Sequence, residues 1–308
     1  MKKILITITA LLLSLIIFAG CSAQSASQGQ SAANITLMSG AFTEIEVLMQ
    51  MASLLIEEHT DLNVVWQDPM HTVPAANALR DGHVDLYVGY DGTVLTTLMG
   101  YDPTDVPEGE ILFEWVQNRA PEEIGLTLLG KFGFENTYAL AVHREFAEEH
   151  NLRTISDLVP FGPSLIFGAE HEFFDVEGSM RFVPFNEHYG FQWRNHVSMD
   201  IALKYAAMNA GNIDVTMVYS TDGLNMSFDL FVLEDDLAFF PEYNVSFQLR
   251  PTLFEEFAES APNLHDVLSL LNGAIDGYTM SYLNYAVDVM GENPRDVARQ
   301  FLTDIGLL

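Results

Sequence analysis

Short apolar runs and stretches of helical periodicity alternate along this chain. The apolar runs predict strands at residues 35–38, 62–66, 84–88, 138–142, 164–167 and 213–218. Apolar side chains at helical spacing predict helices over residues 45–56, 74–80 and 199–209, and again from Pro251 to the end, where Pro294 opens the last helix. This alternation is typical of an α/β protein with mostly parallel sheets that helices cover on both faces.

The first residues have the pattern of an export signal. The chain begins with Met1-Lys2-Lys3, continues with an apolar run over residues 4–18, and reaches Ala19-Gly20 immediately before Cys21. The run is short for a membrane-spanning helix, which needs about 20 apolar residues, and the small residues resemble the cleavage site of a bacterial lipoprotein signal. We therefore expect residues 1–20 to be removed and Cys21 to carry a lipid, in preference to an exported protein with a stray thiol. The polar stretch over residues 21–33 predicts a flexible tether.

Composition and charge narrow the choice of partners. Cys21 is the only cysteine, so its lipidation leaves no disulfide and no cysteine metal site. With 13 basic and 43 acidic residues, the formal charge is -30, which excludes nucleic acid and anionic lipid headgroups as natural partners. The acidic residues are scattered, as on a solvated surface, and suit a saline or alkaline habitat. No later segment is apolar enough to span a bilayer, so a transport channel would be another polypeptide.

Four tyrosines share a local context that indicates a binding site. They are Tyr90, Tyr138, Tyr219 and Tyr243, and each lies at a predicted strand end or in a turn among polar residues. Ligands of doubly wound sheets bind beyond the carboxyl ends of the strands, where such side chains face the crevice. A single tyrosine of this kind would be interpreted as loop packing, whereas four in matching contexts favour a ligand site.

These stretches resemble the substrate-binding proteins of ABC importers for glycine betaine, choline, carnitine and related osmoprotectants. The similar segments run in the same order from about residue 34 to the C-terminus, and they are Phe42-Thr43-Glu44, residues 85–93, 133–140 and 155–158, Tyr219-Ser220-Thr221-Asp222-Gly223, residues 233–241, and the ending Val297-Ala298 with Phe301-Leu302. The resemblance covers essentially the whole mature chain.

The resemblance implies a fold, a cage and partners. The fold would be a two-lobed, periplasmic-binding-protein-like (type II) α/β clamshell with two crossovers between the lobes. Lobe 1 would hold residues 34–132 plus 236–308, and lobe 2 residues 133–235. Tyr90 and Tyr243 from one lobe, and Tyr138 and Tyr219 from the other, match the aromatic cage of the family. A transmembrane permease and a cytoplasmic ATPase would be the partners.

The chemistry of such a cage suits a quaternary ammonium ion. This ion has no N–H donor and a diffuse positive charge, which aromatic faces recognise through their negative quadrupole at about 0.5–2 kcal/mol per ring. Asn136 could add a carbonyl dipole. Because the rings come from two lobes, the ligand would shift the population toward the closed form, and the permease would recognise closure.

Specificity is where this sequence departs from its relatives. Betaine-binding members meet the ligand carboxylate with polar or cationic side chains at two places where this chain has Gly40 and Val176. Thr93 and the backbone N–H groups around Gly40 remain as candidate donors, and Arg181 is a weaker substitute. We therefore expect choline, or a bulkier trimethylammonium compound, to bind more tightly than glycine betaine.

Two other classes of protein have some support in the sequence. A metal-binding or other small-solute receptor lipoprotein of the same architecture is the main alternative, since Glu170-His171-Glu172 and His188 are metal-ligand residue types. No two histidines, however, have the spacing of a helical metal site, and we interpret these residues as exposed surface.

An enzyme is the second class. Asp91, Asp222 and Glu44 could serve as acid–base groups, but the chain has no G-x-S-x-G, P-loop or G-x-G-x-x-G motif and no sign of a cofactor. Asp222 is expected to cap its own loop. The sequence therefore predicts a binding protein without catalytic activity.

Overall fold

The computed structural model of the protein describes residues 33–174, 179–200 and 203–308. The chain divides into Met1–Ala32 and a compact unit, Ala33–Leu308. The predicted signal, the tether up to residue 32, Cys21 and Val176 therefore lie outside the described residues.

The described strands form three sheets. The first sheet has the order β1-β2, the second β3-β10-β4 and the third β7-β6-β8-β5-β9. Their bounds are β1 (Asn34–Met38), β2 (Asn63–Gln67), β3 (Tyr87–Tyr90), β4 (Thr127–Leu129), β5 (Tyr138–His143), β6 (Ile166–Glu170), β7 (Asn195–Met199), β8 (Val215–Tyr219), β9 (Leu230–Val232) and β10 (Val245–Leu249).

The helices cover these sheets. The α-helices are α2 (Thr43–His59), α3 (Thr72–Arg80), α4 (Asp91–Thr93), α5 (Leu112–Glu123), α6 (Arg144–His150), α7 (Ile155–Leu158), α8 (Phe182–Tyr189), α9 (Lys204–Asn209), α10 (Gly223–Ser227), α11 (Leu253–Glu256), α12 (Leu264–Ser269), α13 (Gly277–Asp288) and α14 (Pro294–Asp304). Short segments of other helical types are η1 (Val94–Met99), η2 (Pro103–Asp105), η3 (Val159–Ser164) and η4 (His171–Phe174).

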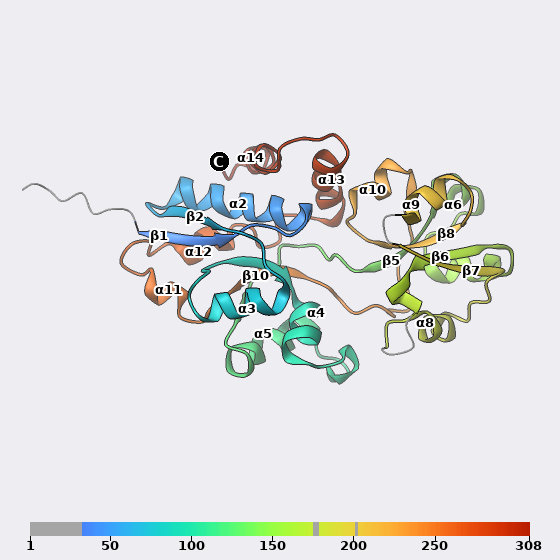
Figure 1. The fold of residues 1–308 in the computed structure, drawn as a ribbon, viewed down its shortest axis with the longest axis horizontal. Coiled ribbons are helices and arrows are strands. Elements are labelled where there is room, and N and C mark those ends of the chain that lie inside the picture. Colours follow the sequence, from blue (N-terminus) through green and yellow to red (C-terminus); the bar gives the residue numbers. More distant parts are fainter. Residues whose placement is uncertain (1–32, 175–178, 201–202) are drawn as a thin grey trace, which may run out of the picture. The chain divides into compact units, whose positions relative to one another are not determined.

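The strands separate into two lobes. The first lobe holds β1–β4 and β10 with helices α2–α5 and α11–α14, and the second holds β5–β9 with α6–α10. The chain passes between them twice, from β4 to β5 and from β9 to β10, seen in Figure 1 as the green and orange connections near the centre. The predicted lobe limits near residues 132 and 236 fall in these passages and stay predictions.

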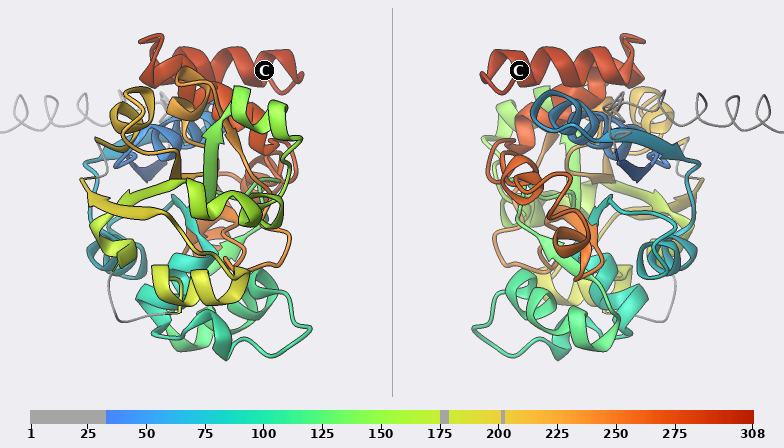
Figure 2. Two further views of the ribbon diagram at one scale, coloured as in Figure 1. Left: turned by 90° about the vertical axis from the view of Figure 1, so that its right-hand side faces the viewer. Right: turned by 90° about the vertical axis from the view of Figure 1, so that its left-hand side faces the viewer.

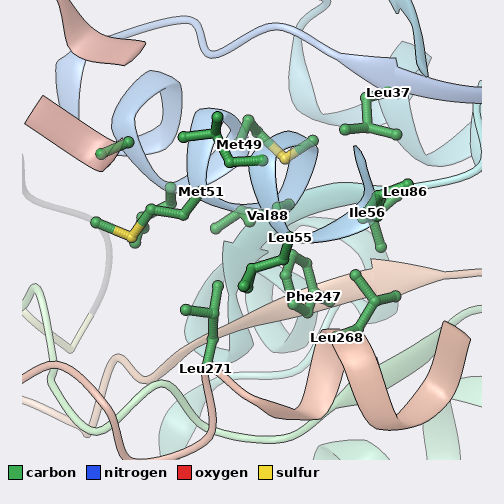
Figure 3. Close-up of a cluster of buried hydrophobic side chains, with 14 of the residues drawn as sticks. Leu37, Met49, Met51, Leu55, Ile56, Leu86, Val88, Phe247, Leu268 and Leu271 are labelled. Atoms are coloured by element: carbon green, nitrogen blue, oxygen red, sulfur yellow. The ribbon is translucent and has the colours of Figure 1, made fainter. Parts of the chain in front are cut away.

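The helix predicted over residues 45–56 becomes the central support of the first lobe. Its buried face includes Met49 and Met51, which are fully inaccessible, and Figure 3 shows the residues of α2 facing Phe247 of β10 and Leu268 of α12. The C-terminal helix α14 packs against α2 and crosses it, since α2 runs across Figure 1, whereas α14 is seen end-on there and runs across Figure 2. Pro294 opens α14 as predicted, after the N-cap residue Asn293. A methionine-rich helix face thus fills the core of the first lobe.

The prediction of mostly parallel sheets is wrong. β1 pairs with β2, and β6 with β7 and β8, in parallel, whereas β10 pairs with β3 and β4, and β5 with β8 and β9, in antiparallel fashion. The reason is that β5 and β10, the first strands after the two passages between the lobes, each run opposite to both strands that flank them. Residues 195–199 also form β7, so the helix predicted from residue 199 begins only at Lys204. The third strand lies at residues 87–90, a little later than predicted.

Candidate ligand-binding site

A cavity of about 620 Å³ is lined by side chains from both lobes. Its described lining residues are Phe42, Thr43, Glu44, Tyr90, Thr93, Asn136, Thr137, Tyr138, Met180, Tyr219, Thr221, Asp222, Pro241, Tyr243, Asn284 and Asp288. The volume lies within the range of about 300–1,000 Å³ that is usual for small-molecule sites.

All four predicted tyrosines line this cavity, in two pairs. The ring centroids of Tyr138 and Tyr219 lie 5.2 Å apart with an interplanar angle of 23°. Those of Tyr90 and Tyr243 lie 5.6 Å apart with an angle of 33°. The structure therefore brings together four side chains that are far apart in the sequence.

Antiparallel pairing positions each pair of rings. Tyr138 in β5 lies directly opposite Tyr219 in β8, so both side chains project from the same face of the sheet. Tyr90 ends β3 opposite Val245, two residues beyond Tyr243. The close approach of the two loops requires glycine at position 92, because a Cβ there would overlap the Tyr243 ring.

Phe42 contributes a ring that the sequence analysis did not count in the cage. It stacks on Tyr90 with a centroid distance of 6.4 Å and an interplanar angle of 6°, and its side chain is half exposed. The available signal in the sequence was the position of Phe42 in Phe42-Thr43-Glu44, one of the segments that carry the family resemblance.

Glu44 is the central polar group of the cavity, a role that the sequence analysis missed. Its Oε1 accepts hydrogen bonds from the Tyr90 hydroxyl (2.6 Å) and Asn136 Nδ2 (3.1 Å). Its Oε2 accepts from Thr221 Oγ1 (2.5 Å) and Asn284 Nδ2 (3.0 Å). Four donors match the acceptor capacity of an ionised carboxylate, so Glu44 can offer a ligand negative charge but no free acceptor site.

The environment of Glu44 has consequences for its ionisation. Only 2% of the residue is exposed, and burial raises the pKa of its carboxyl group, with the four hydrogen bonds acting in the opposite direction. A signal existed in the sequence, because Glu44 lies on the same face of α2 as the buried residues Leu48 and Met51. A carboxylate on an apolar helix face is a functional candidate.

The lining is acidic. Besides Glu44 it includes Asp222 and Asp288, and the described lining residues include no lysine, arginine or histidine. Asp222 accepts hydrogen bonds from the Tyr205 hydroxyl and from the backbone N–H of Leu224 (2.9 Å), which confirms its predicted role as the cap of its loop. The cavity therefore favours a cation over an anion.

Asn136 and Thr93 also line the cavity, in line with their selection from the sequence. Asn136 Oδ1 is buried and accepts no hydrogen bond from the residues that the structure describes, so its dipole is available. Thr93 Oγ1 lies 3.1 Å from the Tyr243 hydroxyl. This contact places a hydroxyl donor at the edge of one ring pair.

Gly40 and Arg181 are not among the described lining residues. The backbone N–H of Gly40 donates to Glu46 Oε2 (2.8 Å), so it is engaged within its own loop instead of facing the cavity. Arg181 donates through Nη1 to the carbonyl of Met180 (3.0 Å). Arg181 Nε is buried and has no hydrogen-bond partner among the described residues, so this nitrogen, unlike the N–H of Gly40, has no acceptor within the described part of the protein.

The residues of the candidate metal site Glu170-His171-Glu172 differ in their burial. Glu170 is buried, contrary to the expectation of an exposed residue, whereas His171 is exposed and its Nδ1 lies 2.6 Å from Ser198 Oγ. Within residues 33–174, 179–200 and 203–308, His, Cys, Asp and Glu side chains form no group of three that could hold a metal ion.

Asp91 connects the two loops that carry Tyr90 and Tyr243. This carboxylate is fully buried and accepts from the backbone N–H of Gly92 (2.7 Å) and from both the N–H (2.8 Å) and Nδ2 (2.9 Å) of Asn244. Burial outweighs these donors and raises the pKa of Asp91 to about 7. Asp91 is thus a positioning residue for the ring pair.

We expect a pH dependence of stability that Asp91→Asn removes. Folded Asp91 keeps its proton up to about pH 7, whereas the carboxyl group has an ordinary pKa of 3.8. The folded state therefore binds more protons between these values, and the contribution of Asp91 to the free energy of unfolding falls as pH rises, by at most about 1.4 kcal/mol per pH unit. Urea unfolding at several pH values measures this: the free energy of unfolding of the natural protein minus that of the variant decreases from about pH 4 to pH 7. Parallel stability curves would contradict the assignment.

The sequence is similar to a known family and to characterised proteins. A family model described as the substrate-binding domain of ABC-type glycine betaine transport systems matches residues 33–304. An ergothioneine transport permease/ergothioneine binding protein of Helicobacter pylori is 32% identical over 266 residues, which cover 86% of this chain and 46% of that protein. The chain thus spans less than half the length of that relative. A carnitine transport binding protein of Listeria monocytogenes is 29% identical over 303 residues, covering 98% of this chain and 96% of the relative.

Solved structures show the same fold. A crystal structure described as a glycine betaine/carnitine/choline ABC transporter superposes with a TM-score of 0.80 at 29% identity, covering 90% of this chain and 99% of the other. A lactococcal binding protein in its closed, liganded form has a TM-score of 0.54 at 15% identity, and this shows the fold alone. The two-lobed α/β fold expected from the resemblance is confirmed. Because the family model spans nearly all of the described residues, the chain belongs to the family of substrate-binding proteins of ABC-type glycine betaine transport systems.

Proposed function

We propose that this protein captures a quaternary ammonium solute in its tyrosine cage outside the cytoplasmic membrane and delivers it to a membrane permease that a cytoplasmic ATPase drives. The observation that carries the proposal is the convergence of four phenol rings on one cavity whose charged lining residues are carboxylates. The names of the Listeria and Helicobacter relatives, which include carnitine and ergothioneine, support a ligand of this class. The arrangement binds its ligand without transforming it.

The energetics of the cage agree with this assignment. Each ring is worth about 0.5–2 kcal/mol toward a well-placed cation, so four rings together contribute about 2–8 kcal/mol, compared with about 8 kcal/mol for micromolar binding. The hydroxyl groups of Tyr90 and Tyr243 are held by Glu44 and Thr93, which fixes the ring orientations before a ligand enters. Such preorganisation lowers the entropy that binding loses.

We expect choline to bind more tightly than glycine betaine, by about tenfold. Both ligands present a trimethylammonium group to the rings, but the carboxylate of betaine would lie among Glu44, Asp222 and Asp288 with no cationic partner in the described lining. Thr93, the hydroxyl group that we propose for the carboxylate end, is among the lining residues. Isothermal titration calorimetry with the two ligands measures the ratio of their Kd values.

A thermal-shift panel extends the test to the class of ligand. The panel contains choline, glycine betaine, carnitine, ergothioneine, zinc and manganese, because a ligand that binds only the folded state raises the melting temperature. A larger shift with betaine than with choline would contradict the preference and leave the cage intact. A shift with metals alone would favour the metal-receptor alternative and contradict the cage.

We also propose that the mature protein is held at the membrane by a lipid on Cys21. The support is the basic start, the short apolar run and the small residues before this single cysteine, all of which lie outside the described residues. Throughout residues 33–174, 179–200 and 203–308, none of the helices combines the length and hydrophobicity that a bilayer crossing needs. A lipid anchor would keep the binding protein close to its permease.

A further inference from the structure

A lysine and a glutamate are buried together beneath the cage. Lys204, the first residue of α9, is 1% exposed, and Glu170, the last residue of β6, is 3% exposed. Lys204 Nζ lies 3.8 Å from Glu170 Oε2. Neither Lys204 Nζ nor either oxygen of Glu170 has a hydrogen-bond partner among the described residues.

The Glu170–Lys204 pair is not expected to stabilise the folded protein. Two desolvated charges repay their loss of hydration only with close geometry and additional hydrogen bonds. The pair has neither, because the separation is long for an ion pair and the polar atoms lack partners in the described part of the chain. A different role is therefore worth seeking at the place where the pair lies.

That place is directly against a ring of the cage. Lys204 Nζ lies 5.3 Å from the centroid of the Tyr219 ring and 5.5 Å from that of Tyr205. Tyr219 lines the cavity, whereas Lys204 and Glu170 are not among its described lining residues, so the ammonium group reaches the ring from the protein interior. Glu170 also acts on the neighbouring ring: burial raises the pKa of the Tyr138 hydroxyl, and the charge of Glu170 adds a smaller effect in the same direction.

We propose that the Glu170–Lys204 pair is an electrostatic tuner of the cage, in which Lys204 weakens and Glu170 strengthens the attraction of the Tyr219 ring for a ligand cation. This inference rests on the proposed function. A cation on one side of a ring is repelled by a second cation held against the same ring. The affinity of the cage is thus set by buried charges as well as by the rings that touch the ligand.

The size of the effect follows from the distances. A ligand ammonium lies within about 6 Å of the ring centroid, so it is roughly 10 Å from the Lys204 ammonium. At an effective dielectric constant of about 20, two unit charges at that separation change a Kd by about tenfold. Glu170 acts with the opposite sign. Burial lowers the pKa of Lys204, whereas the negative charges of Glu170 and Asp222 act in the opposite direction and favour its ammonium form.

Three variants test the inference through the sign of the change in choline affinity. Lys204→Met removes the interior cation and is expected to tighten choline binding at least threefold. Glu170→Gln removes the anion and is expected to weaken binding at least threefold. The double variant E170Q/K204M is the matched control, because it removes both charges and keeps the side-chain volumes, and its Kd is expected to stay within about twofold of that of the natural protein.

The possible outcomes distinguish an effect of the two charges on affinity from a purely structural role of the pair, and both from a failure of the proposed function. Lys204→Met leaves Glu170 buried and unpaired, and this variant could fail to fold. In that case the affinity of E170Q/K204M is compared with that of E170Q, and the double variant must bind choline more tightly. Weaker binding in both single variants, or no change in either, overturns the inference and shows a structural pair. Failure of the natural protein to bind any trimethylammonium ligand overturns the proposed function and the inference together.

Discussion

Glu44→Gln is expected to weaken choline binding by about 100-fold. The substitution keeps the size of the side chain and removes the negative charge that lies among the rings. A unit charge about 5–6 Å from a bound ammonium contributes about 3 kcal/mol at an effective dielectric constant of 20, which corresponds to this loss. Isothermal titration calorimetry on both proteins measures the change.

Two comparisons make the result specific to the charge. Glu58→Gln removes an exposed carboxylate from the same helix, α2, and is expected to leave the affinity unchanged. In the natural protein, choline affinity is also expected to rise with pH through the elevated pKa of Glu44, because a bound cation favours the ionised carboxylate. The Glu44→Gln variant lacks the part of this rise that comes from Glu44 and keeps only the part that comes from the ionisation of Asp91 near pH 7. A loss of less than threefold would show that the rings alone hold the ligand.

Tyr219→Ala is expected to raise the Kd for choline at least tenfold. The change removes one aromatic face and also the stacking partner of Tyr138, whose ring centroid lies 5.2 Å away. Because Tyr138 then loses the contact that orients it, the loss exceeds the contribution of a single ring. Calorimetry with choline measures the effect, and melting curves verify that the variant is folded.

Matched tyrosine variants distinguish the ring from the hydroxyl group. Tyr219→Phe keeps the aromatic face and is expected to stay within about threefold of the natural affinity. Tyr278→Ala removes a tyrosine that is 74% exposed on α13 and absent from the described lining, and it is expected to have no effect. Unchanged affinity in Tyr219→Ala would remove the support for the cage.

The sequence predicted those features of the fold that depend on local patterns. The apolar faces of β1, α2 and β8 follow from neighbouring residues, and the structure places these elements within a few residues of the predicted limits. Strand direction depends on partners that are distant in the chain, such as β10 between β3 and β4, and local periodicity carries no information about it. The prediction of mostly parallel sheets failed for this reason.

The same distinction applies to the site. The four tyrosines could be selected because each lies at a strand end or in a turn, which is a local property. Glu44 is different, since its four donors come from separate parts of the chain, Tyr90, Asn136, Thr221 and Asn284. The burial of Glu170 beside Lys204 likewise depends on tertiary contacts. The local sequence Glu170-His171-Glu172 carries no sign of it and predicts an exposed surface instead.

The hydrogen bonds of Glu44 have a consequence for how this protein can evolve. The carboxylate belongs to α2 of the first lobe, yet Thr221 of the second lobe donates to it. One side chain therefore carries both the charge that attracts the solute and a direct bond across the two halves of the molecule. A substitution of Glu44 that suits a differently charged ligand would also remove the hydrogen bond between the two lobes. New specificities are therefore more accessible through residues such as Thr93, whose hydroxyl contacts Tyr243 within the first lobe.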